Sequence, residues 1–189
     1  YYKNGALESD LEYTKGKLSG SCSWYYPSGN LMKIQEFLNR EYYQIEYYEN
    51  GNQSSYNYEN YNSNGYNSYS TDYYEDGNTM SDTGLSEYDW NDDGVIDESS
   101  SYTYEYDENG NQTLSSESYS YDWDGDGIID EEASYSYSYE YDDNGNLTYQ
   151  SESYEYDNDN DGITDDSSFY SYSYEYNDNG NLISHTTEY

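Results

Sequence analysis

The sequence predicts an all-β fold, an elongated antiparallel array of β-hairpin repeats with acidic loops at one edge. Three observations predict it. A Tyr-x-x-x-Gly turn motif recurs seven times in 189 residues, tyrosine alternates with serine or glutamate between the turns, and a nine-residue acidic segment recurs three times. Repetition at a fixed period together with alternation at period two is typical of strands that pair in series.

The turn motif marks where one predicted strand ends and the next begins. Its glycines stand at positions 5, 29, 51, 77, 110, 145 and 180, and asparagine follows the glycine in six of the seven copies. Asn and Gly favour the positive-φ conformations that tight hairpin turns require. The spacing between glycines lengthens from 22–26 residues to 33–35 at the fourth interval, where the first acidic segment appears. We therefore expect one hairpin repeat throughout, with a loop inserted into the last three units.

Between the turns the pattern is that of strands. Residues 101–106, 134–141 and 171–176 alternate Tyr with Ser, Thr or Glu, which sends the tyrosines to one face of a sheet. The return strand 147–156 begins in one phase and finishes in the other, which predicts a bulge. No helix is expected, because the only candidate, residues 31–41, has mixed periodicity and lies between two hairpin turns. Residues 52–70 are low in complexity and predict a longer loop or irregular strands.

Composition excludes several classes of protein. The formal net charge is −36, and Leu, Ile, Val and Phe together make 19 of 189 residues, which by composition alone is typical of disorder. The 34 tyrosines argue for a folded chain, because each ring can bury apolar area and most lie in ordered alternation. The acidity excludes nucleic acid as a partner. No apolar run is long enough to predict a membrane span.

Charge and composition divide the chain into three predicted segments. Residues 1–50 form near-neutral N-terminal hairpin repeats, residues 51–85 are Tyr/Asn/Ser-rich linking repeats, and residues 86–189 hold the three acidic repeats. All five basic residues lie in the first 40 positions, against 37 of the 41 acidic residues beyond them. The single Cys22 is expected at a half-buried position, with an intermolecular disulfide as the alternative. Because the chain begins at Tyr1, we expect a processed or truncated form.

Two motifs resemble known bacterial repeat families. Tyr25-Tyr26-x-x-Gly29-Asn30-Leu31 resembles the MORN-like repeats of antitoxin-type proteins, and Tyr139-x-Tyr141-Asp142-x-x-Gly145-Asn146-Leu147 resembles the YD repeat of Rhs-type proteins. Both resemblances imply antiparallel β-hairpins in series. Rhs repeats spiral into a shell around a cargo, but 189 residues are too few to enclose one, so that function is not expected here.

The three acidic segments share one spacing of oxygen-bearing residues. Acidic or amide side chains stand at loop positions 1, 3, 5 and 9, with glycine at position 6 for a tight turn and a backbone carbonyl at position 7. This is the ligand spacing of calcium loops. The predicted ligands of three Ca²⁺ ions are Asp89, Asn91, Asp93, Val95 and Asp97; Asp122, Asp124, Asp126, Ile128 and Asp130; Asp157, Asp159, Asp161, Ile163 and Asp165.

The loops depart from the helical EF-hand. Position 12, where that motif has a bidentate glutamate, is Ser100, Ala133 and Ser168, and the flanking segments are predicted strands. The loops therefore resemble the nine-residue calcium loops of the integrin α-subunit propeller. Ca²⁺ fits better than Mg²⁺, which requires a tighter octahedron. The alternative is a solvated acidic turn without metal.

These features predict a structural protein. We expect an extracellular or cell-surface filament subunit, stabilised by calcium at millimolar concentration and polymerising head to tail through open sheet edges or through donation of residues 181–189. The alternative is a calcium-dependent, adhesin-like module that binds glycans or cell surfaces. Trp90 and Trp123 are candidate contacts for it, or else pack over the neighbouring strand. Sequons at Asn52, Asn111 and Asn146 allow glycosylation. An enzyme is not expected, because the single His185 has no matched nucleophile.

Overall fold

The structure is a computed structural model that describes residues 1–159, 161 and 163–189. These residues form fifteen β-strands and no helix. The strands are β1 (Ser9–Asp10), β2 (Tyr13–Thr14), β3 (Lys17–Leu18), β4 (Gly20–Tyr25), β5 (Leu31–Leu38), β6 (Glu41–Tyr47), β7 (Gln53–Asn62), β8 (Gly65–Tyr73), β9 (Thr79–Tyr88), β10 (Glu98–Tyr106), β11 (Gln112–Tyr121), β12 (Glu131–Tyr141), β13 (Leu147–Asp157), β14 (Asp166–Tyr176) and β15 (Leu182–Glu188).

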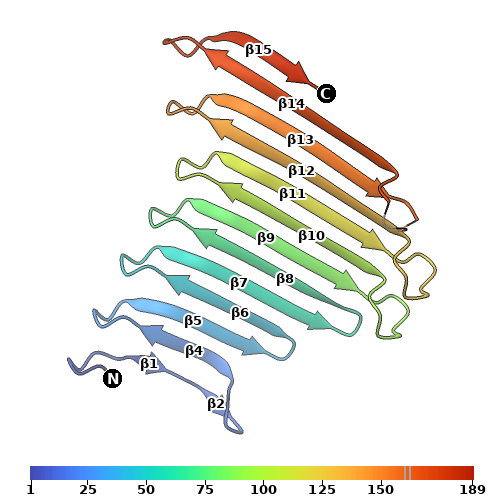
Figure 1. The fold of residues 1–189 in the computed structure, drawn as a ribbon. Helices are drawn as coiled ribbons and strands as arrows, with labels where there is room; N and C mark the ends of the chain where they lie inside the picture. The colour runs from blue at the N-terminus through green and yellow to red at the C-terminus, as the bar shows by residue number, and fades with distance from the viewer. Residues whose placement is uncertain (160, 162) are drawn as a thin grey trace.

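Thirteen of the strands form one antiparallel sheet in chain order, from β1 and β4 through to β15. The Gly-containing turns line one lateral edge, and the acidic loops follow each other along the opposite edge (Figure 1). Strands β2 and β3 form a separate small hairpin. The predicted all-β hairpin array is confirmed. The three predicted segments are consecutive parts of this one sheet. The hairpin series agrees with the architecture that the family resemblances imply, while the resemblances themselves stay predictions.

One sequence-based expectation needs correction. Residues 52–70 are neither a long loop nor irregular, because they form most of β7 and β8, which pair in unbroken register from Ser55 with Asp72 to Asn62 with Gly65. Cross-strand pairing decided this segment, and local composition gave no signal of it. Residues 31–41 form strand β5 and the start of β6, so the expectation that they are not a helix is confirmed.

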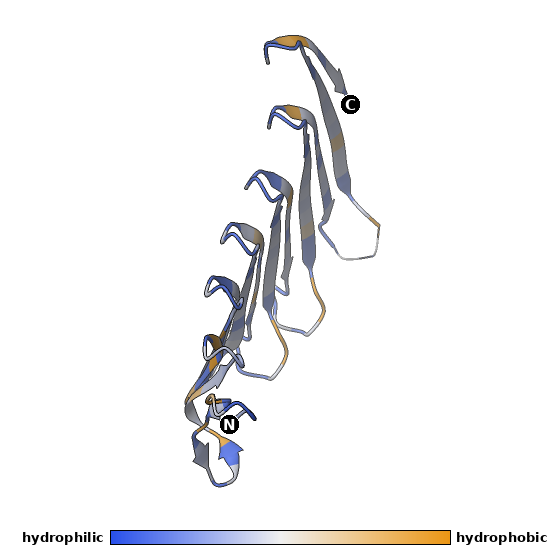
Figure 2. Cartoon of the chain, turned by 90° about the vertical axis from the view of Figure 1, so that its left-hand side faces the viewer, coloured by the Kyte–Doolittle hydropathy of each residue, from blue (hydrophilic) through white to orange (hydrophobic). Residues whose placement is uncertain are grey.

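The sheet is a single layer (Figure 2). Among the described residues, Cys22 is the one buried hydrophobic side chain, and its exposed fraction is 0% rather than the expected half. Most strand residues are half-buried instead. No helix in the described part of the chain is long and apolar enough to cross a membrane. Stability must therefore come from the backbone ladder and from side chains packed against each other on the sheet surface.

The two faces of the sheet differ in chemistry. Strand register places a tyrosine face on one side and a serine-rich face, with Ser101, Ser118, Ser136 and Ser153 among its members, on the other. The tyrosine face carries Tyr43, Tyr56, Tyr58, Tyr69, Tyr88, Tyr102, Tyr104, Tyr119, Tyr121, Tyr135, Tyr137, Tyr139, Tyr154, Tyr156, Tyr170, Tyr172 and Tyr174. The predicted sorting of tyrosine by alternation is confirmed.

Neighbouring rings on the tyrosine face pack against each other across strands. Tyr58 stacks on Tyr69 with ring centroids 5.8 Å apart, and Tyr135 lies 5.0 Å from Tyr154. Tyr102 lies over Gly84, where an added Cβ would come within 2.2 Å of the tyrosine ring. Glycine inside a strand usually weakens it. Here the absence of a side chain at Gly84 lets the Tyr102 ring lie directly on the backbone of β9. Aromatic pairs of this kind contribute about 0.5–1.5 kcal/mol beyond the area they bury.

A register shift accompanies the hairpin turns. In the 141–147 hairpin, Glu140 pairs with Tyr149 and Tyr141 pairs with Leu147, so Thr148 is the extra residue. The predicted bulge is therefore present, but at the first residues of β13 instead of between Tyr149 and Tyr154. Those two tyrosines occupy opposite faces of a regular strand. The phase change in the sequence therefore arises because the Tyr149 ring lies on the serine-rich face, and the backbone between Tyr149 and Tyr154 is regular.

The first four turns are linked to each other by tyrosine hydroxyls. In each, the second tyrosine of the motif donates a hydrogen bond of 2.7–2.8 Å to the carbonyl of the last strand residue before the next turn. The four bonds are Tyr2 to Tyr25, Tyr26 to Tyr47, Tyr48 to Tyr73 and Tyr74 to Tyr106. Turn asparagines add bonds to the following turn, as from Asn30 to the Glu49 carbonyl. The repeats are therefore joined along this edge by side chains as well as by the ladder.

The last three turns are capped within themselves. Asp107, Asp142 and Asn177 replace the second tyrosine, and the Asp107 carboxylate accepts hydrogen bonds from the backbone of Asn109 and Asn111 at 2.9 Å. The side-chain amide of Asn111, at 3.0 Å, and these backbone groups lower the pKa of Asp107. The change from Tyr-Tyr to Tyr-Asp in the motif thus marks a change from bonds between repeats to bonds within one turn.

Removal of one linking hydroxyl should weaken the sheet measurably. Tyr48→Phe deletes the 2.8 Å bond to the Tyr73 carbonyl and keeps the ring. We expect the free energy of unfolding to fall by about 0.5–1.5 kcal/mol, the net worth of such a bond. Denaturant titration followed by circular dichroism measures it. Tyr13→Phe is the matched control, because Tyr13 is 61% exposed, and an equal loss in both variants would contradict the linking role.

Carboxylates on the tyrosine face hold phenols in their neutral form. Glu117 accepts hydrogen bonds from Tyr104 at 2.7 Å and from Tyr119 at 2.9 Å. The bond to Glu117, with partial desolvation, raises the pKa of Tyr104 from 10.0 to about 12. Because the folded-state pKa is raised, the stabilisation is complete below about pH 10 and is lost as the pH rises through about 12.

An alkaline titration should resolve this effect. In Glu117→Gln the negative charge beside the two phenols is lost, so we expect the pKa values of Tyr104 and Tyr119 to fall toward 10. Tyrosinate absorbance should then show about two more phenols ionising between pH 10 and 11 than in the unsubstituted protein. Glu140→Gln, at an exposed site on the opposite face, is the control and should leave the titration curve unchanged. Superimposable curves for both variants would refute the assignment.

Candidate metal-binding loops

The three acidic loops join β9 to β10, β11 to β12 and β13 to β14 (Figure 1). In each, the backbone N–H of loop position 9 donates to the carbonyl of the residue before position 1. These bonds run from Asp97 to Tyr88, from Asp130 to Tyr121 and from Asp165 to Tyr156, at 2.7–2.8 Å. The ladder of each strand pair therefore brings the first and last carboxylates of the loop together. The flanking strands confirm that these are β-hairpin loops.

The second loop is wound around the carboxylate of its first residue. Asp122 is only 1% exposed, and its two oxygens accept hydrogen bonds from the backbone of Gly125 and Gly127, both at 2.7 Å. Gly127, at position 6, has φ +85°, the left-handed conformation expected there. A buried carboxylate held by backbone donors is fixed in place before any ligand arrives.

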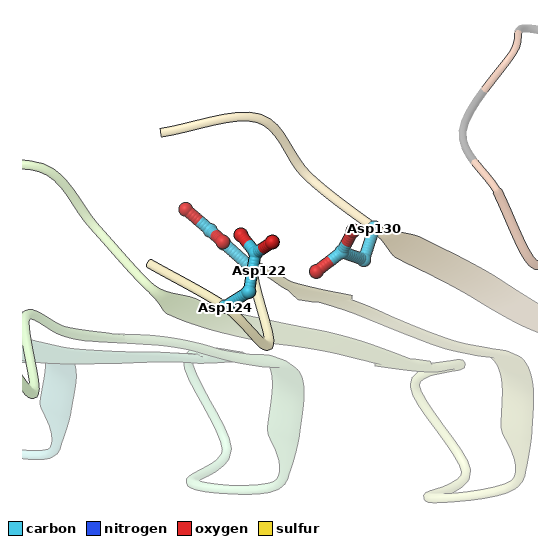
Figure 3. A group of neighbouring side chains, drawn as sticks. All are labelled: Asp122, Asp124 and Asp130. Carbon is cyan, nitrogen blue, oxygen red and sulfur yellow. The ribbon is translucent and has the colours of Figure 1, made fainter. Parts of the chain in front are cut away.

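Three carboxylates converge in this loop. One oxygen each from Asp122, Asp124 and Asp130 lies within 4.8 Å of the others. Figure 3 shows Asp130, at the end of the loop, pointing toward the other two. Oxygens bound to one Ca²⁺ at about 2.3–2.6 Å lie at most about 5 Å apart, so this spacing fits a shared divalent ion. Asp126, also predicted as a ligand, lies outside the cluster and accepts a hydrogen bond from the backbone of Ile128.

The third loop repeats the arrangement. Asp157, Asp159 and Asp165 form the same cluster from positions 1, 3 and 9. The Asp165 carboxylate accepts from the backbone of Asn158 at 2.9 Å, as Asp130 accepts from Trp123 at 2.7 Å in the second loop. Asp161 accepts from the backbone of Ile163. Gly162, the predicted turn glycine at position 6, lies outside the described residues.

The first loop has the same fold with one ligand changed. Asp89 and Asp97 are 9% and 2% exposed, and Asp89 accepts from the backbone of Gly94 at 2.8 Å. Asn91 stands at position 3, so two buried carboxylates and an amide oxygen replace the three carboxylates of the other loops. Asp93 at position 5 accepts from the backbone of Val95. An amide oxygen is an acceptable Ca²⁺ ligand, but it brings less charge.

The predicted carbonyl ligands share one local geometry. The backbone N–H groups of Val95, Ile128 and Ile163 each donate to the aspartate two residues earlier at 2.8–2.9 Å. Their side chains point to solvent, with exposed fractions of 43%, 65% and 68%. Each carboxylate at position 5 thus accepts a hydrogen bond from the backbone of its own turn. To bind an ion as well, the carboxylate would have to rotate or use one oxygen for both the hydrogen bond and the ion.

The first two loops touch each other, which the sequence did not predict. The backbone of Asp122 donates to the Asp97 carbonyl at 2.8 Å, so the last residue of one loop anchors the first residue of the next. A Cβ at Gly125 would lie 2.7 Å from the Asn91 amide. The residues involved are at least 25 positions apart in different repeats, and only the stacking of hairpins brings them together.

Two tryptophans at position 2 form an exposed aromatic surface beside these loops. Trp90 and Trp123 are 51% and 58% exposed, with ring centroids 6.3 Å apart. Trp123 also stacks on Tyr121 at 4.7 Å and donates through Nε1 to Glu131 at 3.1 Å. The two indole rings pack on each other, and about half of each remains open to solvent.

The remaining residues singled out from the sequence lie elsewhere. His185, on β15, stacks between Tyr172 and Tyr174 with centroids 6.5 and 5.5 Å away, and its Nε2 lies 3.2 Å from the Thr187 hydroxyl. Cys22 Sγ lies 3.7 Å from the Glu12 carbonyl, under the N-terminal hairpin. Comparison of the sequence with protein-family models and with curated proteins gives no match.

Proposed function

We propose that the chain is a calcium-stabilised structural subunit of an extracellular or cell-surface filament. The observation that carries the proposal is the single sheet of consecutive hairpins, which does not close on itself among the described residues. A free strand edge offers unpaired backbone donors and acceptors to another chain. Joining through sheet edges, or donating residues 181–189 to a neighbour, would turn the one-layer sheet into a longer ribbon.

Calcium enters the proposal through the acidic loops. Carboxylates of one loop converge to within 4.8 Å, where their mutual repulsion opposes folding unless a cation lies between them. Three Ca²⁺ would reduce the formal charge from −36 to −30, and would do so where the charge is densest. Asp122, Asp124 and Asp130 would hold one ion, and the equivalent residues of the other loops the rest. Loops of this kind suit millimolar calcium outside cells.

A second candidate function rests on the aromatic surface. Trp90 and Trp123 remain half exposed, and exposed aromatic rings are typical of binding surfaces. A calcium-dependent, adhesin-like module could present these rings to glycans. Electron microscopy distinguishes the two functions, because a filament subunit forms fibres and a binding module forms dispersed particles.

Chelation tests the calcium-stabilised assembly. With millimolar calcium we expect fibres and a strong β signal in circular dichroism, and with EDTA we expect both to decline, because folding and ion binding are coupled. Sedimentation and microscopy measure the assembly. Isothermal titration should give three ions per chain. An unchanged fold and no heat of binding after chelation would contradict the proposal.

A charge-matched pair of variants distinguishes a specific metal site from the general effect of the negative charge of the protein. Asp122→Asn removes one converging carboxylate, whereas Asp143→Asn removes the same charge from an exposed turn on the opposite edge. We expect Asp122→Asn to weaken binding at one ion by at least about tenfold, through the loss of a charged ligand, and Asp143→Asn to bind as the unsubstituted protein does. Equal affinities in the two variants would contradict a specific site in this loop.

A further inference from the structure

One close pair of tyrosine rings lies apart from the tyrosine face. Tyr61, near the end of β7, pairs with Tyr66, near the start of β8, across the turn at residues 63–64. Strand register places both rings on the serine-rich face of the sheet. Their ring centroids are 4.8 Å apart, which is shorter than the 5.0 Å between Tyr135 and Tyr154 on the tyrosine face.

The backbone explains why these two rings are so close. The N–H of Tyr61 donates a hydrogen bond of 2.8 Å to the carbonyl of Arg40, on the side of β7 that faces away from β8. Tyr61 and Tyr66 are therefore a non-hydrogen-bonded pair of the β7–β8 ladder, in which the Cα atoms are about 4.5 Å apart instead of about 5.5 Å. Side chains come closest at such positions, so the ladder holds the two rings within reach of each other.

The surroundings of Tyr61 favour its oxidation. Its side chain is 52% exposed, and an open hollow lined by Leu38, Arg40 and Asn62 lies beside it. Its hydroxyl donates a hydrogen bond of 3.1 Å to the Glu59 carboxylate, which raises the pKa of Tyr61 and keeps the phenol neutral. A neutral phenol that gives up an electron must also release its proton, and the bonded carboxylate is there to accept it.

The β7–β8 hairpin is also a place where a covalent link has a physical use. Both strands carry polar side chains on both of their faces, and no hydrophobic core lies beneath them. The register of strands that are polar on both faces is weakly specified, because a slipped pairing exposes no apolar surface. A bond between residues 61 and 66, next to the turn, would exclude every slipped register of this hairpin.

We propose that Tyr61 and Tyr66 are an oxidative crosslinking site, at which a peroxidase with hydrogen peroxide joins the two rings as dityrosine. Each phenol loses one electron to the oxidant and one proton, which passes to Glu59 from Tyr61 and to water from Tyr66. The two radicals form a carbon–carbon bond between ring positions ortho to the hydroxyls, and the hydrogens on those carbons move to the phenolic oxygens. The chain loses two hydrogen atoms, and one hydrogen peroxide becomes two waters. The reaction requires neither calcium nor a second copy of the chain.

Treatment of the dilute protein with peroxidase and hydrogen peroxide tests the site. We expect dityrosine fluorescence, a fall in the 22.2 kDa mass by two hydrogen atoms, and a single chain on a denaturing gel. Digestion after glutamate releases residues 60–75, in which tandem mass spectrometry locates the link. Tyr61→Phe keeps the ring and should abolish the link. Tyr135→Phe removes a hydroxyl from the 5.0 Å pair on the other face and should leave the yield of the link unchanged.

A second variant isolates the proton transfer to Glu59. In Glu59→Gln we expect crosslinking near pH 7 to slow at least about tenfold, because the amide is a poor proton acceptor. The rate should recover as the pH approaches about 10, where the phenol loses its proton unaided. Glu105→Gln, at an exposed site on the same face, should keep the unsubstituted rate. Equal rates in the two variants would overturn the role of Glu59. Links spread over many tyrosine pairs, or an equal rate of the 61–66 link in protein unfolded by urea, would overturn the site itself.

Discussion

The backbone ladder of a one-layer sheet is the interaction on which the rest of this structure depends. With one buried hydrophobic side chain among the described residues, no core holds the strands together, and every strand beyond β3 owes its position to its neighbours. The tyrosine face adds the apolar contribution that a core would supply. Partial burial raises the pKa of Tyr56, Tyr102 and Tyr139, because neighbouring side chains on the tyrosine face desolvate these phenols although no second layer covers them.

A sheet of this kind is close to one-dimensional, because each repeat contacts mainly the repeats on either side. The lateral edges therefore matter more than in a globular domain. On one edge the turns are linked by tyrosine hydroxyls in the first half and capped internally in the second half. On the other edge the acidic loops concentrate charge in the half where the turns no longer bond to each other. The two lateral edges of the acidic half thus differ, with internally capped turns on one and converging carboxylates on the other.

Net charge also limits how the chain can meet its own copies. Carboxylates are distributed over both faces and both lateral edges of the acidic half, so like-charge repulsion keeps these surfaces apart.

The features that could be predicted from the sequence are those that depend on local interactions. Alternation fixed the tyrosine face, the Tyr-x-x-x-Gly motif fixed the turns, and the positions 1, 3 and 9 of the acidic segments predicted the residues that converge at 122, 124 and 130. These features depend on spacing within one hairpin, where strand geometry leaves few choices. The strands of 52–70 and the true place of the bulge were not predicted, because both depend on register with another strand.

Other features exist only in three dimensions. The hydroxyl of Tyr48 reaches the carbonyl of Tyr73, and Asp97 anchors Asp122, because hairpins stacked at a fixed spacing bring equivalent positions of successive repeats together. Sequence alone determined the repeat, its turns and the spacing of its acidic loops, since these are short-range consequences of residue type. The tertiary structure decided which residues of successive repeats touch, since this depends on the register of every strand with its neighbours.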